Sequence, residues 1–282
     1  MSHPSKRGTL FVAYLLALSG LKIPLHAQGP ENILHPGAAE APASSPETYP
    51  DSEGFERRKM IILRGLAAGG LDRWRRGYFS GGDPGKYLPG HAMAKLLLNP
   101  DDPEPAQYMN DERSYKEHYH FAAVNWARFY PLFGERILTE ETRRKFANAA
   151  ATYGSYLRHG GTENHKTMWW SSANVLPHYV QHSRFGGQPR EEALRTAKEH
   201  LRQYVSGLFD AGAGEWDSST YYTFTFNGLM NIYDFSPDEE ARLLAKAGLE
   251  SRPDRGRAPS HTAASSARRW HALPPCKKRR RN

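Results

Sequence analysis

The sequence predicts an all-α protein built of antiparallel helical hairpins. The middle of the 282-residue chain divides into successive segments in which apolar residues recur at helical spacing, separated by short connections. No segment shows the convincing alternation of a half-buried strand, and no fixed-period repeat is visible. An incomplete (α/α) toroid and a helical repeat array both fit this pattern.

The first helix is expected over residues 55–76, where apolar side chains share one face, although three glycines weaken its continuity. Residues 77–90 are expected to form a loop, because Gly and Pro recur there. A short helix is expected over residues 92–98. A connection rich in Pro and Asp leads from it to Asp111.

Longer helices are expected in the rest of this region, because apolar residues recur every three or four positions. Three of their starts carry capping signals. Thr139 opens a sequence that resembles a capping box, Thr162 suits an N-cap, and Ser236 precedes Pro at the first helical position. The expected ranges are 112–133, 139–157, 164–182, 190–209, 219–233 and 236–249.

The net charge of +8 is concentrated at the two ends of the chain. Residues 1–27 hold three Lys or Arg and no acid, and residues 251–282 hold ten Lys or Arg and one acid. Residues 28–250 therefore carry a net charge of about −4, which gives no argument for a polyanion-binding domain. No nucleic-acid partner is expected.

Four regions are expected along the chain. Residues 1–27 resemble a secretory signal peptide, whose apolar run is too short to span a membrane comfortably. We therefore expect a secreted or periplasmic protein without a stable membrane anchor, and a retained anchor is the alternative. Residues 28–52 have the composition of a flexible linker, and residues 53–250 form the helical domain. Residues 251–282 form a basic disordered tail, or a frame-shifted or truncated end.

The stretch from Gly161 to Trp170 is the first that suggests chemistry. Glu163 would lie in the first turn of a helix, where its charge suits the positive end of the helix dipole. Asn164 and His165 would project from the same turn, where a neutral imidazole is favoured. An amide donor beside a neutral imidazole suits proton abstraction, and a capped helix start with an incidental His is the alternative.

A second stretch, residues 212–235, leads from a Gly-rich loop into a helix. Asp217 or Ser218 suits the N-cap of that helix, which places Tyr221 near its beginning. In a layer of hairpins such helix starts can gather at one end and line a common cleft. Tyr221 is therefore a candidate for the same cleft as the Asn-His pair.

Together the two stretches resemble alginate-lyase-type, or heparinase-like, polysaccharide lyases with an (α/α)-toroid fold. Asn164 and His165, with Trp169 nearby, are similar to the family's Asn-Asn-His-x-Tyr-Trp motif. The segment from Tyr221 to Leu229 is similar to its Tyr-His-x-Phe-Ala-Leu-x-x-Leu segment, and the order along the chain is the same. The resemblance implies an incomplete toroid.

The resemblance also implies cleavage of an acidic, uronate-containing polysaccharide by β-elimination, without a metal or another cofactor. Asn164 would neutralise the uronate carboxylate, His165 would act as the base or assist that neutralisation, and Tyr221 would protonate the leaving glycosidic oxygen. The residues expected to bind the substrate are Lys166, Trp169, Glu215, Trp216 and Tyr222.

Two departures from that family favour a rival function. Glu163 stands where the family has its first Asn, and Glu215 and Asp217 occupy the region of the family's basic residue before the Tyr. Lys166 or Arg158 would have to compensate for the missing charge. The three acids instead suit an inverting glycoside hydrolase on an (α/α) toroid. A non-catalytic glycan-binding remnant is the third alternative, because the C-terminal segment is unusual.

Two further patterns carry less chemistry. His118 and His120 are two residues apart and do not share a helix face, so they are not expected to form a metal pair. One of them can still reach the cleft. Residues 81–86 are rich in Gly but lack the spacing of a phosphate-binding loop.

Overall fold

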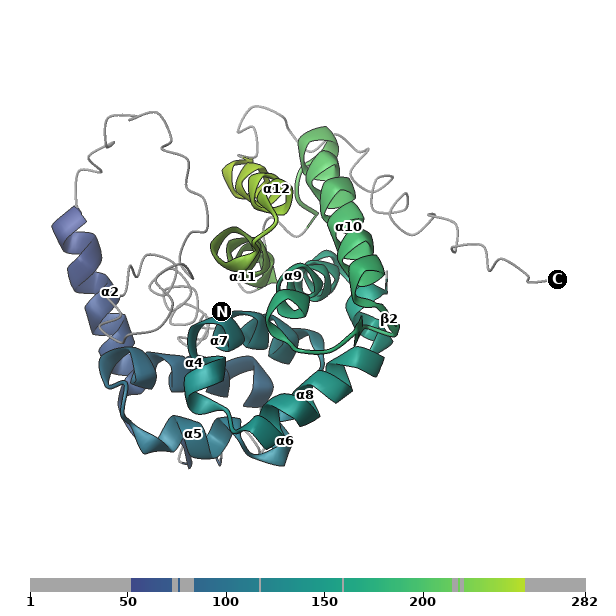
Figure 1. Ribbon diagram of the computed structural model, residues 1–282. Helices are drawn as coiled ribbons and strands as arrows, with labels where there is room; N and C mark the ends of the chain where they lie inside the picture. Colours follow the sequence, from purple (N-terminus) through teal and green to yellow (C-terminus); the bar gives the residue numbers. More distant parts are fainter. Residues whose placement is uncertain are drawn as a thin grey trace.

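A computed structural model describes a mostly helical fold, which confirms the all-α prediction (Figure 1). The described residues are 52–72, 76, 84–116, 118–158, 160–214, 218 and 221–251. The expected signal peptide, nearly all of the expected linker and nearly all of the expected tail lie outside them. Across the described ranges, no helix combines the length and the apolar character needed to cross a membrane.

Three helices lie side by side in the middle of the fold: α7 (His120–Ile137), α9 (Glu163–Tyr179) and α11 (Tyr221–Phe235) (Figure 1). Their first turns meet at one end, where the ring centroids of Phe121 and Phe224 are 4.6 Å apart. At the other end, the hydroxyl of Tyr179 donates to the backbone oxygen of Phe235 at 2.7 Å. Helices α9 and α11 therefore run in the same direction and begin at the same face.

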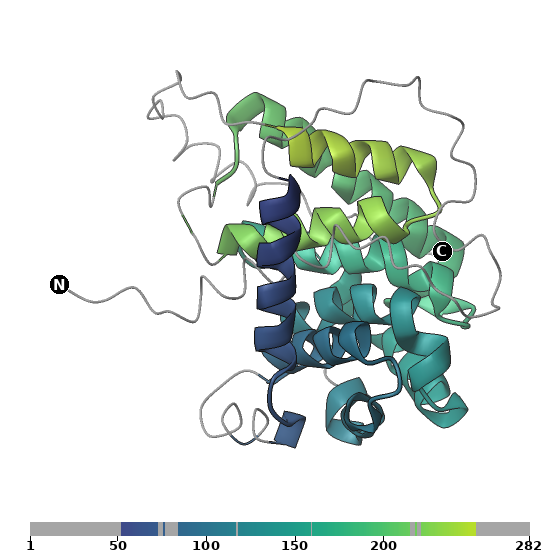
Figure 2. The same ribbon diagram turned by 90° about the vertical axis from the view of Figure 1, so that its left-hand side faces the viewer.

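The remaining helices cover this central group. α8 (Glu140–Thr152), α10 (Arg190–Ala211) and α12 (Glu239–Glu250) each follow one central helix along the chain, and α12 packs against both α10 and α11. On the other side, α4 (Pro84–Leu98) packs against α7, and α2 (Ser52–Ala67) packs against α4. Figure 2 shows α2 standing crosswise to α11 and α12. Short elements complete the described fold: α5 (Pro103–Met109), α6 (Glu112–Tyr115) and the 3₁₀ turn η1 (Gly154–Leu157).

The predicted loop over residues 77–90 is wrong for its second half, because α4 already begins at Pro84. Proline suits the first turn of a helix, where its missing N–H is not needed. Pro89 inside α4 cannot donate to the backbone oxygen of Gly85. The side chain of Asn125 on α7 donates there instead, at 2.9 Å, and also reaches the oxygen of Lys86 at 3.1 Å. A tertiary contact therefore supplies the donor that the sequence lacks.

Other predicted helices are shorter or divided. The first ends at Ala67 rather than at residue 76, and Gly69 then takes a positive φ of 87°. The helix predicted over 112–133 is divided into α6 and α7, because Tyr119 is extended with ψ at 165°. The helix predicted over 139–157 likewise divides into α8 and η1.

A short β-hairpin was absent from the prediction. Arg184–Phe185 (β1) pairs with Gln188–Pro189 (β2) in antiparallel fashion around two glycines with positive φ. The backbone N–H groups of Gly186 and Gly187 donate to the last turn of α8, at 2.9 and 2.8 Å. Two-residue strands are too short to show alternation, so only the Gly pair indicated this turn.

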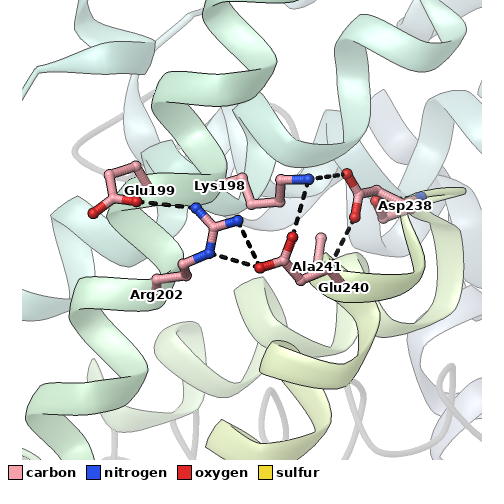
Figure 3. Close-up of polar contacts among 7 residues, drawn as sticks. Lys198, Glu199, Arg202, Asp238, Glu240 and Ala241 are labelled. Carbon is pink, nitrogen blue, oxygen red and sulfur yellow. Dashed lines mark hydrogen bonds and ion pairs between the residues drawn. The ribbon is translucent and has the colours of Figure 1, made fainter.

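A polar network joins α10 to the start of α12 (Figure 3). The ammonium of Lys198 lies 2.6 Å from Asp238 and 3.3 Å from Glu240, and Arg202 lies 2.6 Å from Glu240 and 3.0 Å from Glu199. Asp238 also accepts the backbone N–H of Ala241 at 3.0 Å, so the same carboxylate caps α12. Asp238 therefore serves both as the N-cap of α12 and as the partner of Lys198 in an ion pair.

Replacing Asp238 separates these two contributions. Asp238→Ala removes both the cap and the ion pair with Lys198, and we expect a loss of about 1 to 2 kcal/mol in the free energy of unfolding. Asp238→Asn keeps a capping oxygen and is expected to lose less than about 1 kcal/mol. Urea unfolding measures both variants. Equal losses would contradict the capping role.

Candidate functional site

Side chains from the first turns of four helices gather at one face of the fold. Lys86 comes from α4, His120 from α7, His165 from α9, and Tyr221 and Tyr222 from α11. We call this group the helix-start cluster. Helix starts carry partial positive charge, so this face favours anions and disfavours protonated imidazoles.

The two imidazoles of the helix-start cluster are in direct contact. The ring centroids of His120 and His165 are 3.9 Å apart with an interplanar angle of 35°, and both side chains are half-buried. The ring of Phe121 lies 6.2 Å from His165. On the other side of His165, Gly161 has a φ of +101°, and a Cβ atom there would lie 3.0 Å from the Cβ of His165. The chain thus needs a glycine where it passes this imidazole.

Asn164 is the second residue of α9 and is 1 % exposed. Thr162 occupies the N-cap position as predicted, but its side chain caps no backbone N–H. The hydroxyl of Thr162 instead makes a short hydrogen bond to Oδ1 of Asn164. This contact ties the amide of Asn164 to the residue that precedes α9.

Glu163 links α9 to α10 and α11. Its carboxylate accepts a hydrogen bond from the hydroxyl of Tyr204 at 2.8 Å. Burial and the charge of Glu163 raise the pKa of Tyr204 well above its usual value and raise that of Tyr222 to about 12. Both phenols therefore keep their protons at neutral pH. A Cβ atom on Gly214 would lie 2.9 Å from Oε2 of Glu163, so the chain passes close to this carboxylate soon after α10 ends.

Lys166 and Trp169 lie deeper in α9. Lys166 is 9 % exposed, and burial lowers its pKa while the charge of Glu163 opposes that shift. Trp169 is 7 % exposed, with its ring centroid 5.1 Å from Tyr156 and 5.6 Å from Tyr153. Trp169 therefore packs in the core next to His120, and the ring centroids of the two residues are 6.2 Å apart. Direct contact of either residue with a substrate stays a prediction.

Tyr221 is the first residue of α11 and is 46 % exposed. The hydroxyl oxygen of Ser218 accepts its backbone N–H at 3.1 Å, which confirms Ser218 as a cap for this helix. The other residues predicted in this loop, Glu215, Trp216 and Asp217, lie outside the described residues. Tyr221 is thus placed at the same face as His165, since Phe224, one turn later, contacts Phe121.

His118 does not reach the helix-start cluster. It is 5 % exposed, and its Nδ1 lies 2.9 Å from the hydroxyl of Tyr156. Its Nε2 is buried without a hydrogen-bond partner among the described residues. Burial lowers the pKa of His118 to about 4. Of the two histidines considered from the sequence, His120 lies in the helix-start cluster and His118 belongs to the core.

Acidification is expected to destabilise the protein through His118. Between pH 6.5 and about pH 4 the unfolded chain binds a proton at this residue that the folded protein excludes. The free energy of unfolding therefore falls as pH falls through this window, by about 3 kcal/mol. Urea unfolding at both ends of the window measures the loss. His118→Asn keeps a polar group near Nδ1 without titrating, and should lose less stability on acidification; equal losses would contradict the assignment.

Sequence reasoning missed Lys86 and Tyr204. Lys86 was assigned to a loop, because the Gly and Pro residues around it indicated a loop where α4 in fact begins. The Pro at the first helical position was the available signal. Tyr204 lies in the middle of α10 and carries no sequence signal, since only the packing of α10 on α9 brings it to Glu163.

In the described part of the chain, no three His, Cys, Asp or Glu side chains lie close enough together to hold a metal ion. Comparison with known proteins gives no further guide: no family model, curated protein or solved structure matches the chain.

Proposed function

We propose that this protein is a polysaccharide lyase on an incomplete (α/α) toroid and cleaves a uronate-containing polysaccharide by β-elimination. The observation that carries the proposal is that the first turns of α7, α9 and α11 meet at one face. The ring centroids of His165 and His120 are 3.9 Å apart, and the ring of Phe121 contacts both His165 and Phe224 of α11. Parallel central helices covered by returning outer helices are the arrangement that a toroid requires.

β-Elimination needs three groups in one place. A base removes the proton next to the carboxylate, a donor or cation stabilises the charge that develops there, and an acid protonates the leaving oxygen. We assign the base to His165, the stabilisation to Asn164, and the acid to Tyr221. The helix starts support this assignment, because they favour a neutral imidazole and an anionic substrate at the same face.

Hydrolysis is the second candidate, and one observation favours it. Glu163 is held by Tyr204 and lies against Gly214, which directly precedes Glu215 in the sequence. An inverting hydrolase needs two carboxylic acids, and Glu163 is placed to supply one of them. Glu163 in this alternative acts as one partner of the acid–base pair.

A panel of alginate, polygalacturonate and heparosan tests the proposal. β-Elimination produces an unsaturated uronate that absorbs in the ultraviolet, together with new reducing ends. New reducing ends without that absorbance would establish hydrolysis instead. Glycan binding without cleavage would establish the non-catalytic alternative. From the signal-like leader we propose that this activity lies outside the cytoplasm.

A further inference from the structure

Lys86 belongs to the helix-start cluster but has no role in the proposed elimination, which uses His165, Asn164 and Tyr221. Its ammonium lies 4.2 Å from the ring centroid of Phe121, 5.0 Å from that of Phe224 and 5.4 Å from that of Tyr87. Three aromatic rings from α4, α7 and α11 therefore border one cation. Contacts of this kind contribute about 0.5 to 2 kcal/mol each and restrict the rotamers of a flexible side chain.

The rings that border Lys86 are also the neighbours of the proposed base and acid. Phe121 lies 6.2 Å from His165, and Phe224 follows Tyr221 by one turn of α11. The ammonium of Lys86 therefore lies next to the two rings that connect His165 to the start of α11. This position comes from the packing of α4 on α7, far away in sequence from both motifs.

A second lysine, Lys166, competes for the role of substrate cation. Lys166 is 9 % exposed, and burial lowers its pKa while the charge of Glu163 opposes that shift. Lys86 is half-buried and lies at the face that the helix starts share. The geometry thus favours Lys86 over Lys166.

We propose that Lys86 binds a carboxylate of the polymer and makes the protein selective for free uronates over their methyl esters. This inference rests on the proposed function, which supplies the uronate polymer as the substrate. It also supplies the full positive charge that the sequence motif lacks before Tyr221. An ammonium held by rings meets the carboxylate without first ordering a flexible side chain, so its effect appears mainly in KM.

Lys86→Met tests this role, because methionine keeps an unbranched apolar stem against the rings and removes the charge. On a free uronate polymer we expect kcat/KM to fall roughly 10- to 100-fold, mostly through a higher KM. On the methyl-esterified form of the same polymer the change should be less than about threefold. Lys86→Arg, which restores the charge, should recover much of the loss. Lys246→Met, on the exposed side of α12, is the matched control and should leave both activities unchanged.

A loss by Lys86→Met that is equal on both polymers would overturn the proposal, since it would indicate damage to the fold or to the chemistry. Activity equal to that of Lys246→Met would overturn it as well. Binding separates this inference from the lyase assignment. Calorimetry with a saturated uronate tetrasaccharide compares His165→Ala with the double variant that also carries Lys86→Met. If the parent protein cleaves none of the polymers while His165→Ala still binds the tetrasaccharide through Lys86, the carboxylate site is retained and the lyase is rejected. No binding to His165→Ala, or binding unchanged by Lys86→Met, would reject the carboxylate site.

Discussion

Replacing His165 by alanine is expected to lower kcat on the preferred uronate polymer by about 10²- to 10⁴-fold, which is the usual contribution of a positioned acid or base. The loss should appear in kcat rather than in KM, because the imidazole acts on the proton that leaves in the transition state. The absorbance of the unsaturated product, followed over a range of polymer concentrations, separates the two parameters.

The control for this variant is His182→Ala. His182 is also half-buried, and its Nδ1 accepts the backbone N–H of Arg184 at 3.0 Å, next to the β-hairpin and outside the helix-start cluster. It should keep full activity. Thermal unfolding of His165→Ala should remain close to that of the parent protein, since the side chain is only half-buried. Full lyase activity in His165→Ala would contradict the assignment of the base.

Replacing Arg128 is expected to give the largest loss of stability. Arg128 is 2 % exposed and ties the middle of α7 to the last turns of α11. Its Nε donates to Oδ1 of Asn231 at 2.8 Å, its Nη2 donates to Oδ2 of Asp234 at 2.6 Å, and its guanidinium lies 5.0 Å from the ring centroid of Phe235. Arg128→Met keeps most of the packing but leaves both acceptors without this donor. We expect a loss of about 3 kcal/mol in the free energy of unfolding.

Arg144→Met is the matched control, because Arg144 is exposed on α8 and its loss should change stability by less than about 0.5 kcal/mol. Urea unfolding of the two variants at neutral pH gives the comparison. A loss in Arg128→Met no larger than that of Arg144→Met would show that the contacts with Asn231 and Asp234 do not hold α7 to α11.

The helices themselves could be predicted, because apolar residues at helical spacing record the face that each helix buries. Their boundaries depended on contacts that no local pattern records. α4 begins early because Asn125 satisfies the backbone oxygen that Pro89 leaves open. α7 begins late because Tyr119 is extended, which sends His118 into the core beside Tyr156 and leaves His120 at the helix start.

The candidate site divides in the same way. Capping signals placed Asn164, His165 and Tyr221 in first turns, which is where the structure has them. Capping says nothing about which helices lie next to each other. His120, which contacts His165, and Lys86, which contacts Phe121, join this face only through the packing of α7 on α9 and of α4 on α7.

The mass of the new non-reducing ends tests the central claim most directly. Cleavage of a defined, saturated uronate oligosaccharide by the mature protein is followed by mass spectrometry of both fragments. β-Elimination predicts that the masses of the two fragments add up to that of the substrate, with one fragment lighter by one water molecule than the saturated sugar. Fragments that have together gained one water molecule would demonstrate hydrolysis and contradict the lyase.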